Sequence, residues 1–81
     1  MPYPEYILTE RLGEERIILN LQNEEYLSLN ESATLIWEGA TQGLSVEQIA
    51  AGLSSKFDVD EQEIKNDVVV FLEKLTKLKL I

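Results

Sequence analysis

The sequence predicts an α+β fold in which a three-stranded antiparallel sheet is followed by three helices. Two observations predict it. Along the first third of the chain, apolar and polar residues alternate as they do in half-buried strands. From Asn30 onward, apolar residues recur at helical spacing behind residues that commonly cap helices. The change falls between Leu29 and Asn30, and a chain of 81 residues is expected to form a single domain, residues 1–81.

The first two predicted strands form a hairpin. A mixed apolar segment, residues 6–12, is the first strand, and the β-rich run at residues 16–21 is the second. Gly13 lies in the connection between them, where a turn is expected. In the second strand, one face collects the apolar side chains Ile17, Leu19 and Leu21.

The third predicted strand, Glu25–Leu29, follows a short polar connection and completes an antiparallel meander. Leu27 and Leu29 fall on one face of this strand, and Tyr26 and Ser28 fall on the other. Because the chain turns directly into a helix, we expect one side of the strand to be an exposed edge. The free N–H and C=O groups of such an edge can pair with another chain.

Each of the three helices is expected to begin behind a capping residue. Asn30 precedes the first helix, which runs from residue 31 to about 38 or 40. Ser45 opens the second helix in a capping box with Gln48, and Asp60 caps the third. The expected buried positions are Val46, Ile49, Ala50 and Leu53 in the second helix, and Ile64, Val68, Phe71, Leu72, Leu75 and Leu78 in the third.

The third helix is more apolar than its packing requires. Residues 68–72 are all apolar, so at 100° per residue Val69 and Val70 lie away from the axis of the buried stripe. One interpretation is that a partly covered surface tolerates these β-branched residues. The other is that one of the two valines, without a choice between them, lines a groove for a side chain of a partner.

The composition is that of a soluble globular domain with a strong acidic excess. The chain is 44% hydrophobic and carries a formal net charge of −8. This charge opposes binding to the phosphate backbone of nucleic acids. It either serves solubility or complements a basic or neutral peptide. A cytoplasmic location is expected, since neither a signal peptide nor a membrane-length apolar segment is recognisable.

Most catalytic and metal chemistry is excluded by the residue types. The chain has neither cysteine nor histidine, which removes thiolate chemistry, the usual zinc sites and histidine acid–base catalysis. The acidic residues at 58–63 resemble a calcium loop only superficially, because Val59 interrupts the pattern of oxygen ligands. We therefore expect no enzymatic activity, no cofactor and no bound metal.

Three helices beside a small sheet give a winged helix-turn-helix-like arrangement, so a DNA-binding regulator is an alternative. The second or the third helix would have to be the recognition helix. Both begin with acidic residues, and neither contains an arginine that could bind guanine or phosphate. A structural subunit or antitoxin-like protein, which folds only with its partner, is a further alternative.

The order and spacing of these motifs resemble those of the PqqD-like proteins, the RiPP recognition elements. Residues 27–38 are similar to the strand-to-helix signature of the family, and residues 43–50 to its glycine-containing turn into the second helix. Residues 67–75 resemble its third helix, and the similarity extends over about residues 5–81. Gln42 and Lys79 depart from the pattern, since many members have Asp and Gly at these turn and helix-end positions.

The resemblance implies a non-catalytic domain that binds the leader segment of a ribosomally synthesised precursor peptide. The leader would be added as a strand to the third strand and would lie against the third helix, the two walls that the residues had already indicated. Carried over by position, the peptide-binding residues are Glu25, Tyr26, Leu27, Ser28 and Leu29 on the strand and Asp67, Val70, Phe71 and Lys74 on the helix.

The resemblance also implies the partners. They are the precursor peptide and a separate leader peptidase or other modifying enzyme, with no nucleic acid and no membrane. Free-standing members of this size are most similar to the leader-binding proteins of lasso-peptide pathways. The alternative within the family is a peptide chaperone that serves a radical enzyme in pyrroloquinoline quinone biosynthesis.

Overall fold

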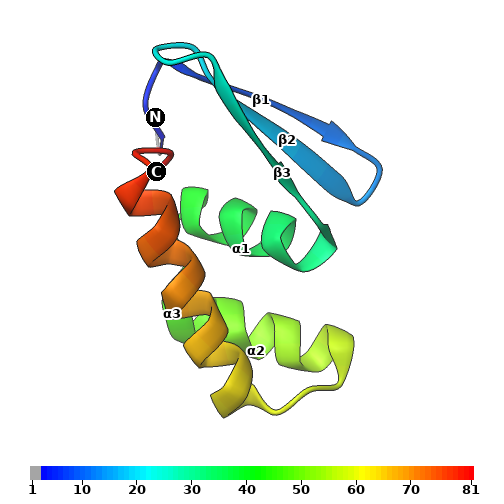
Figure 1. Ribbon diagram of the computed structural model, residues 1–81. Helices are drawn as coiled ribbons and strands as arrows, with labels where there is room; N and C mark the ends of the chain where they lie inside the picture. Colours follow the sequence, from blue (N-terminus) through cyan, green and yellow to red (C-terminus); the bar gives the residue numbers. More distant parts are fainter. Residues whose placement is uncertain (1–2) are drawn as a thin grey trace.

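The structure, a computed structural model, describes residues 3–81 and has the predicted order of elements (Figure 1). The strands β1, β2 and β3 form one antiparallel sheet in the order β1-β2-β3, so that β3 is an edge strand. The expected α+β fold, with its three strands followed by three helices, is thereby confirmed. The elements are β1 (Ile7–Leu12), β2 (Glu15–Asn20), β3 (Glu25–Leu29), α1 (Glu31–Thr41), α2 (Val46–Phe57) and α3 (Glu61–Lys77).

The predicted helix starts are confirmed by the capping hydrogen bonds. The Asn30 side chain accepts a hydrogen bond from the backbone N–H of Ala33 at 2.9 Å. Ser45 and Gln48 form both bonds of the capping box, and Asp60 accepts from two backbone N–H groups of the first turn of α3. Because each cap satisfies N–H groups that lack partners within the helix, these residues fix where the helices begin.

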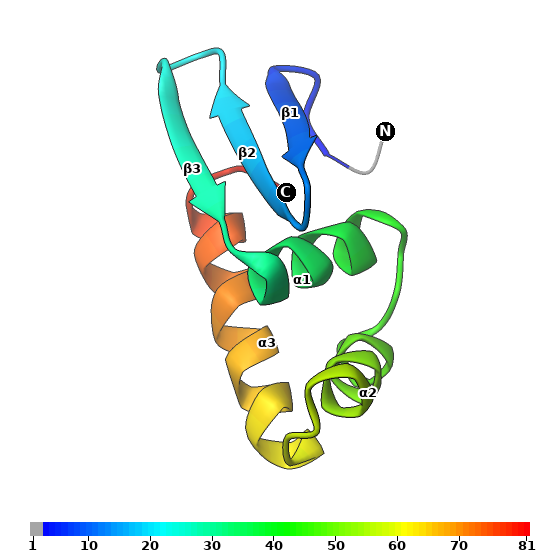
Figure 2. The ribbon, with the colours of Figure 1, turned by 90° about the vertical axis from the view of Figure 1, so that its right-hand side faces the viewer.

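All three helices lie on one side of the sheet (Figures 1 and 2). On that side Ile18 and Leu29 are buried against Trp37 of α1. The apolar face formed by Ile17 and Leu19 points away from the helices, and Leu21, just after β2, is also exposed. The most apolar face of β2 is thus the outer one, although the apolar face of an antiparallel sheet ordinarily covers the core.

Two clusters make up the apolar core. One joins the sheet to Trp37 and Leu75, and the other joins α1 and α2 to Val68 of α3. Phe71 and Leu72 are partly buried and pack against both clusters, so α3 connects the two halves of the domain. Among residues 3–81, no helix is both long enough and apolar enough to cross a membrane.

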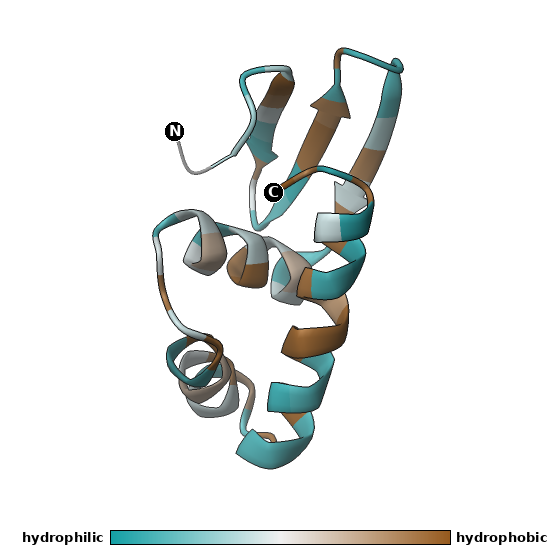
Figure 3. Cartoon of the chain, turned by 90° about the vertical axis from the view of Figure 1, so that its left-hand side faces the viewer, coloured by the Kyte–Doolittle hydropathy of each residue, from teal (hydrophilic) through white to brown (hydrophobic). Residues whose placement is uncertain are grey.

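The chain after α3 turns back toward the sheet. The N–H of Leu80 donates to the carbonyl of Leu75 at 2.9 Å, and the N–H of Lys79 donates to that of Thr76 at 3.0 Å. This pair of bonds is a Schellman motif, which requires a left-handed residue, and Lys79 has a φ of 58°. The Tyr6 hydroxyl donates to the Lys79 carbonyl at 2.8 Å and holds the turn in place. Leu80 is thereby buried, and Figure 3 shows the apolar tail in brown.

Lys79→Gly is expected to raise the free energy of unfolding by about 1 kcal/mol, because glycine adopts the left-handed conformation without the steric cost that a lysine has. Urea denaturation monitored by far-UV circular dichroism measures this change. Lys77→Gly, two residues earlier in the last turn of α3, is the matched control and is expected to destabilise by roughly 0.5–1 kcal/mol. An equal loss of stability in both variants would contradict the role assigned to Lys79.

Candidate functional site

The edge of β3 is an open backbone surface. β3 pairs with β2 from Asn20↔Glu25 to Arg16↔Leu29, and within the described chain no strand pairs with its other side. Figure 2 shows β3 at the border of the sheet, on the same side of the molecule as α3. In an antiparallel edge strand, every second residue directs its N–H and C=O groups away from the sheet. These groups are available to an added strand.

The backbone of α3 stays clear of this edge, since no Cα atom of α3 lies within 8 Å of one in β3. The space beside β3 contains a hollow of about 170 Å³ between the strand and the chain that follows α3. Leu78, expected to be buried on the stripe of the third helix, is instead the exposed C-cap residue on the wall of this hollow. The hollow is lined by Ile18, Asn20, Asn23, Glu25, Tyr26, Leu27, Leu78 and Leu80.

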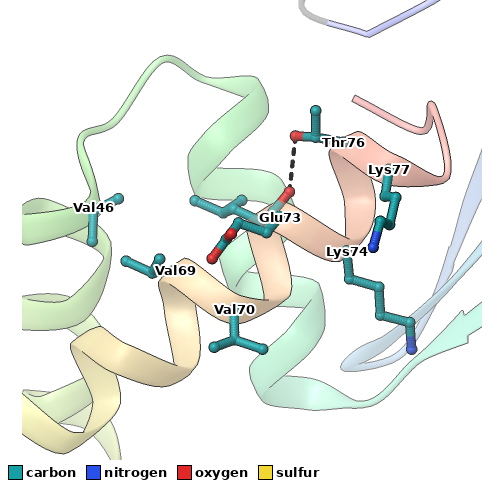
Figure 4. A pocket seen from close by; sticks show the side chains of 8 residues that line it. Val46, Val69, Val70, Glu73, Lys74, Thr76 and Lys77 are labelled. Carbon is teal, nitrogen blue, oxygen red and sulfur yellow. Dashed lines mark hydrogen bonds between the residues drawn. The ribbon is translucent and has the colours of Figure 1, made fainter.

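A second, larger hollow lies on the exposed side of α3 and has a volume of about 820 Å³ (Figure 4). Val69 points toward Val46 of α2, and Val70 lies about 100° further around the helix (Figure 4). Val70 is 66% exposed and Val69 is 38% exposed. Both valines therefore line this hollow together with Lys74, and Val70 is the more exposed of the two.

The nine predicted site residues fall into four groups. The hollow beside β3 takes in Glu25, Tyr26 and Leu27, and the hollow on α3 takes in Val70 and Lys74. Two residues are mainly structural, because Leu29 is buried in the core and Phe71 packs against both core clusters. Ser28 and Asp67 are exposed and line neither hollow. The assignment of all nine to one peptide site remains a prediction.

The hollow beside β3 also contains residues that the sequence reasoning did not include in the site. Leu78 and Leu80 reach it only because the chain reverses at Lys79, which brings the tail back toward the strand. Asn20 is buried at the end of β2, and its side-chain oxygen accepts the N–H of Gln22 at 2.9 Å. The sequence does contain a signal for this reversal: an apolar pair, residues 80–81, follows the polar Lys79 at the end of the third helix.

One carboxyl just after the end of β3 has a shifted pKa. At the start of α1, a hydrogen bond with Glu14 is the main cause that raises the pKa of the Glu31 carboxyl above its usual value. Within residues 3–81, no group of three or more acidic, cysteine or histidine side chains is placed to hold a metal ion. What the site offers is a row of free backbone groups beside apolar walls.

The fold and this surface define an α+β domain with a free strand edge flanked by a helix. Residues 15–81 match the family model described as PqqD, coenzyme PQQ synthesis protein D. The chain belongs to the PqqD family, as the sequence resemblance had predicted. A comparison with curated proteins gave no match.

Two solved structures have a similar fold, each with a TM-score of 0.87. One is described as TbiB1 in complex with the TbiA(beta) leader peptide; it is 24% identical, and the alignment covers 99% of this chain and 93% of that chain. The other is described as lasso peptide synthetase B1 complexed with the leader peptide, at 22% identity and with 95% and 91% of the two chains covered.

Proposed function

We propose that this protein binds the leader segment of a ribosomally synthesised precursor peptide and does not itself catalyse a reaction. The observation that carries the proposal is the unpaired edge of β3, which lies beside an apolar hollow on the inner side of the sheet. Membership of the PqqD family supports it, as does the similarity in fold to two proteins described in complex with leader peptides.

Binding proceeds by strand addition. The leader pairs with the free N–H and C=O groups of Glu25–Leu29 and becomes the fourth strand of the sheet. A backbone hydrogen bond contributes about 0.5–1.5 kcal/mol net, whereas a fully buried leucine-sized side chain contributes about 1.5–3 kcal/mol. Strand pairing therefore sets the register, and the apolar leader side chains that enter the hollow at Leu27, Leu78 and Leu80 determine specificity.

The third helix forms the opposite wall. Asp67, Val70, Phe71 and Lys74 lie along one side of α3, at spacings of three and four residues that place them on neighbouring turns. Phe71 supports this wall from the core. Asp67 and Lys74 present opposite charges about two turns apart, which favour one orientation of a charged leader.

We assign the protein to a lasso-peptide pathway, where it presents the bound precursor to a separate leader peptidase. The similarity in fold to a protein described as lasso peptide synthetase B1 supports this setting. The description of the family model favours the alternative, a peptide chaperone in pyrroloquinoline quinone biosynthesis. Affinities for the leader segments of a lasso precursor and a pyrroloquinoline quinone precursor, measured side by side, distinguish the two settings.

Strand addition predicts a binding pattern with a period of two along the leader. We expect N-methylation of every second backbone amide, which removes a hydrogen bond to β3, to weaken binding at least tenfold. The intervening positions should tolerate the methyl group. Fluorescence polarisation with a labelled leader, taken from the small open reading frame nearest the gene for this chain, measures the affinities.

The unmethylated leader at low and high salt is the control, because backbone pairing and apolar burial survive salt that screens charges. If the leader does not bind, the proposed function is wrong. If it binds but every methylated peptide retains its affinity, the leader is recognised in another way and strand addition is wrong.

A further inference from the structure

The outer face of the sheet is an unpartnered apolar surface separate from the edge of β3. Two rows of side chains cross it, because cross-strand pairing places Leu8 beside Leu19 and Leu19 beside Tyr26, and places Ile17 between Glu10 and Ser28. No helix covers this face (Figures 1 and 2). A shallow hollow of about 480 Å³ runs along it, lined by Leu8, Thr9, Glu10, Leu12, Ile17 and Leu19.

Both faces of the sheet carry apolar side chains, although burial alone favours them only on the face that the helices cover: Ile7, Ile18 and Leu29 are buried on the inner face. The inner face also carries the polar residues Arg11, Arg16 and Asn20, whereas the outer face exposes leucines, an isoleucine and a tyrosine beside Glu10 and Glu15. Leu8 is 58% exposed and Tyr26 is 72% exposed. Contiguous exposed apolar surface on a small domain is typical of an interaction site.

The charges around this face specify the chemistry of its partner. Arg11 and Arg16, the two arginines of the chain, are both held on the inner side by Glu38, at 3.1 and 2.6 Å. The lysines all lie at or after Lys56, on the helices and the tail. The outer face is therefore left with only acidic charges, Glu10 and Glu15. A second copy, with the same acidic rim and a net charge of −8, is repelled.

We propose that the outer face of the sheet docks the processing enzyme that receives the bound leader, through a surface of that enzyme with an apolar centre and a rim of lysine and arginine. This proposal rests on the function proposed above. The leader occupies the edge of β3 and the inner hollow, so the outer face of β1 and β2 stays free while the leader is bound. The two partners therefore bind at the same time, on different faces of the sheet.

The test uses isothermal titration calorimetry to measure how tightly this protein binds the enzyme encoded next to its own gene. The titration is made once with the protein saturated with leader and once without leader. Leu8→Thr/Ile17→Thr removes apolar surface from the outer face while threonine keeps the strand propensity. Leu44→Thr/Val59→Thr is the matched control, because Leu44 and Val59 are each 42% exposed and lie outside the sheet, whereas Leu8 and Ile17 are 58% and 37% exposed.

We expect the outer-face variant to bind the enzyme at least tenfold more weakly, with leader affinity unchanged, and the control variant to bind both as the wild type does. Glu10→Lys/Glu15→Lys should also weaken enzyme binding, and the loss of affinity should be larger at low salt than at high salt. The proposal is wrong if the enzyme does not bind the wild type, or if it binds the outer-face variant equally well. It is also wrong if sedimentation velocity shows that this face joins two copies of the chain.

The two proposals fail in different ways. If the enzyme binds through the outer face but the leader does not bind, the function proposed for the edge of β3 is wrong and the docking surface stands. If the outer-face variant loses leader affinity as well as enzyme affinity in a folded protein, the two surfaces are not separate, and the docking proposal is overturned. Amide chemical shifts of the variant, recorded before either titration, establish that it is folded.

Discussion

Replacing Val70 with aspartate is expected to weaken leader binding by about 1–3 kcal/mol, or roughly 5- to 150-fold. The reason is that a leader side chain packed against the helix wall would meet a charge that must be stripped of water. Val70 is highly exposed in the free protein, so the substitution should leave the fold intact. Fluorescence polarisation with the labelled leader measures the loss of affinity.

Val69→Asp is the matched comparison, since the neighbouring valine is less exposed and points toward Val46 at the α2 end of the same hollow (Figure 4). It should reduce leader affinity much less than Val70→Asp does. Equal losses in the two variants would show that the whole exposed side of α3 is contacted. Unchanged affinity in a folded Val70→Asp protein would remove Val70 from the site.

Glu38→Gln is expected to lower the free energy of unfolding by about 2–4 kcal/mol. The Glu38 carboxylate accepts from the Arg16 guanidinium at 2.6 Å, and the two side chains are only 17% and 15% exposed. Arg16 also lies over the Trp37 ring, at 5.1 Å from its centroid, inside the joint between the sheet and α1. Without the Glu38 carboxylate, the Arg16 guanidinium loses the anionic partner that offset the cost of its desolvation. Urea denaturation measures the change.

A second substitution separates the loss of the ion pair from the loss of packing. Arg16→Met in the Glu38→Leu background replaces both charges with apolar groups, which is often close to neutral for a buried pair. We expect this double variant to recover most of the stability that Glu38→Gln loses. If Glu38→Gln is as stable as the wild type, the pair is only a surface contact and does not hold the sheet on α1.

The local elements of the fold follow from short stretches of sequence. Each helix begins where a side chain satisfies free N–H groups within three residues, so Asn30, Ser45 and Asp60 are sufficient to locate the starts. The bounds of β3 agree with the prediction, whereas β2 begins and ends one residue earlier than expected. Strand ends depend on pairing with a neighbour, and the sequence of one strand does not contain that information.

The candidate site was only partly predictable, because some of its residues come together only through contacts between distant parts of the chain. The edge of β3 followed from the order of the elements, and the apolar excess on the third helix indicated a second surface. The contribution of Leu78 and Leu80 depends on the reversal at Lys79 and on the bond from Tyr6, which joins residues 73 positions apart. The difference in exposure between Val69 and Val70 likewise depends on where α2 packs against α3.

The sequence by itself determined the class of fold, the order of its elements, the helix caps and the family, because these rest on local chemistry and on the spacing of motifs. Only the tertiary structure decided which face of the sheet is covered. A period of two assigns Ile17 and Leu19 to one face and Ile18 to the other, but it does not say which face receives the helix. The packing of Trp37 on Ile18, together with the capture of both arginines by Glu38, decided it.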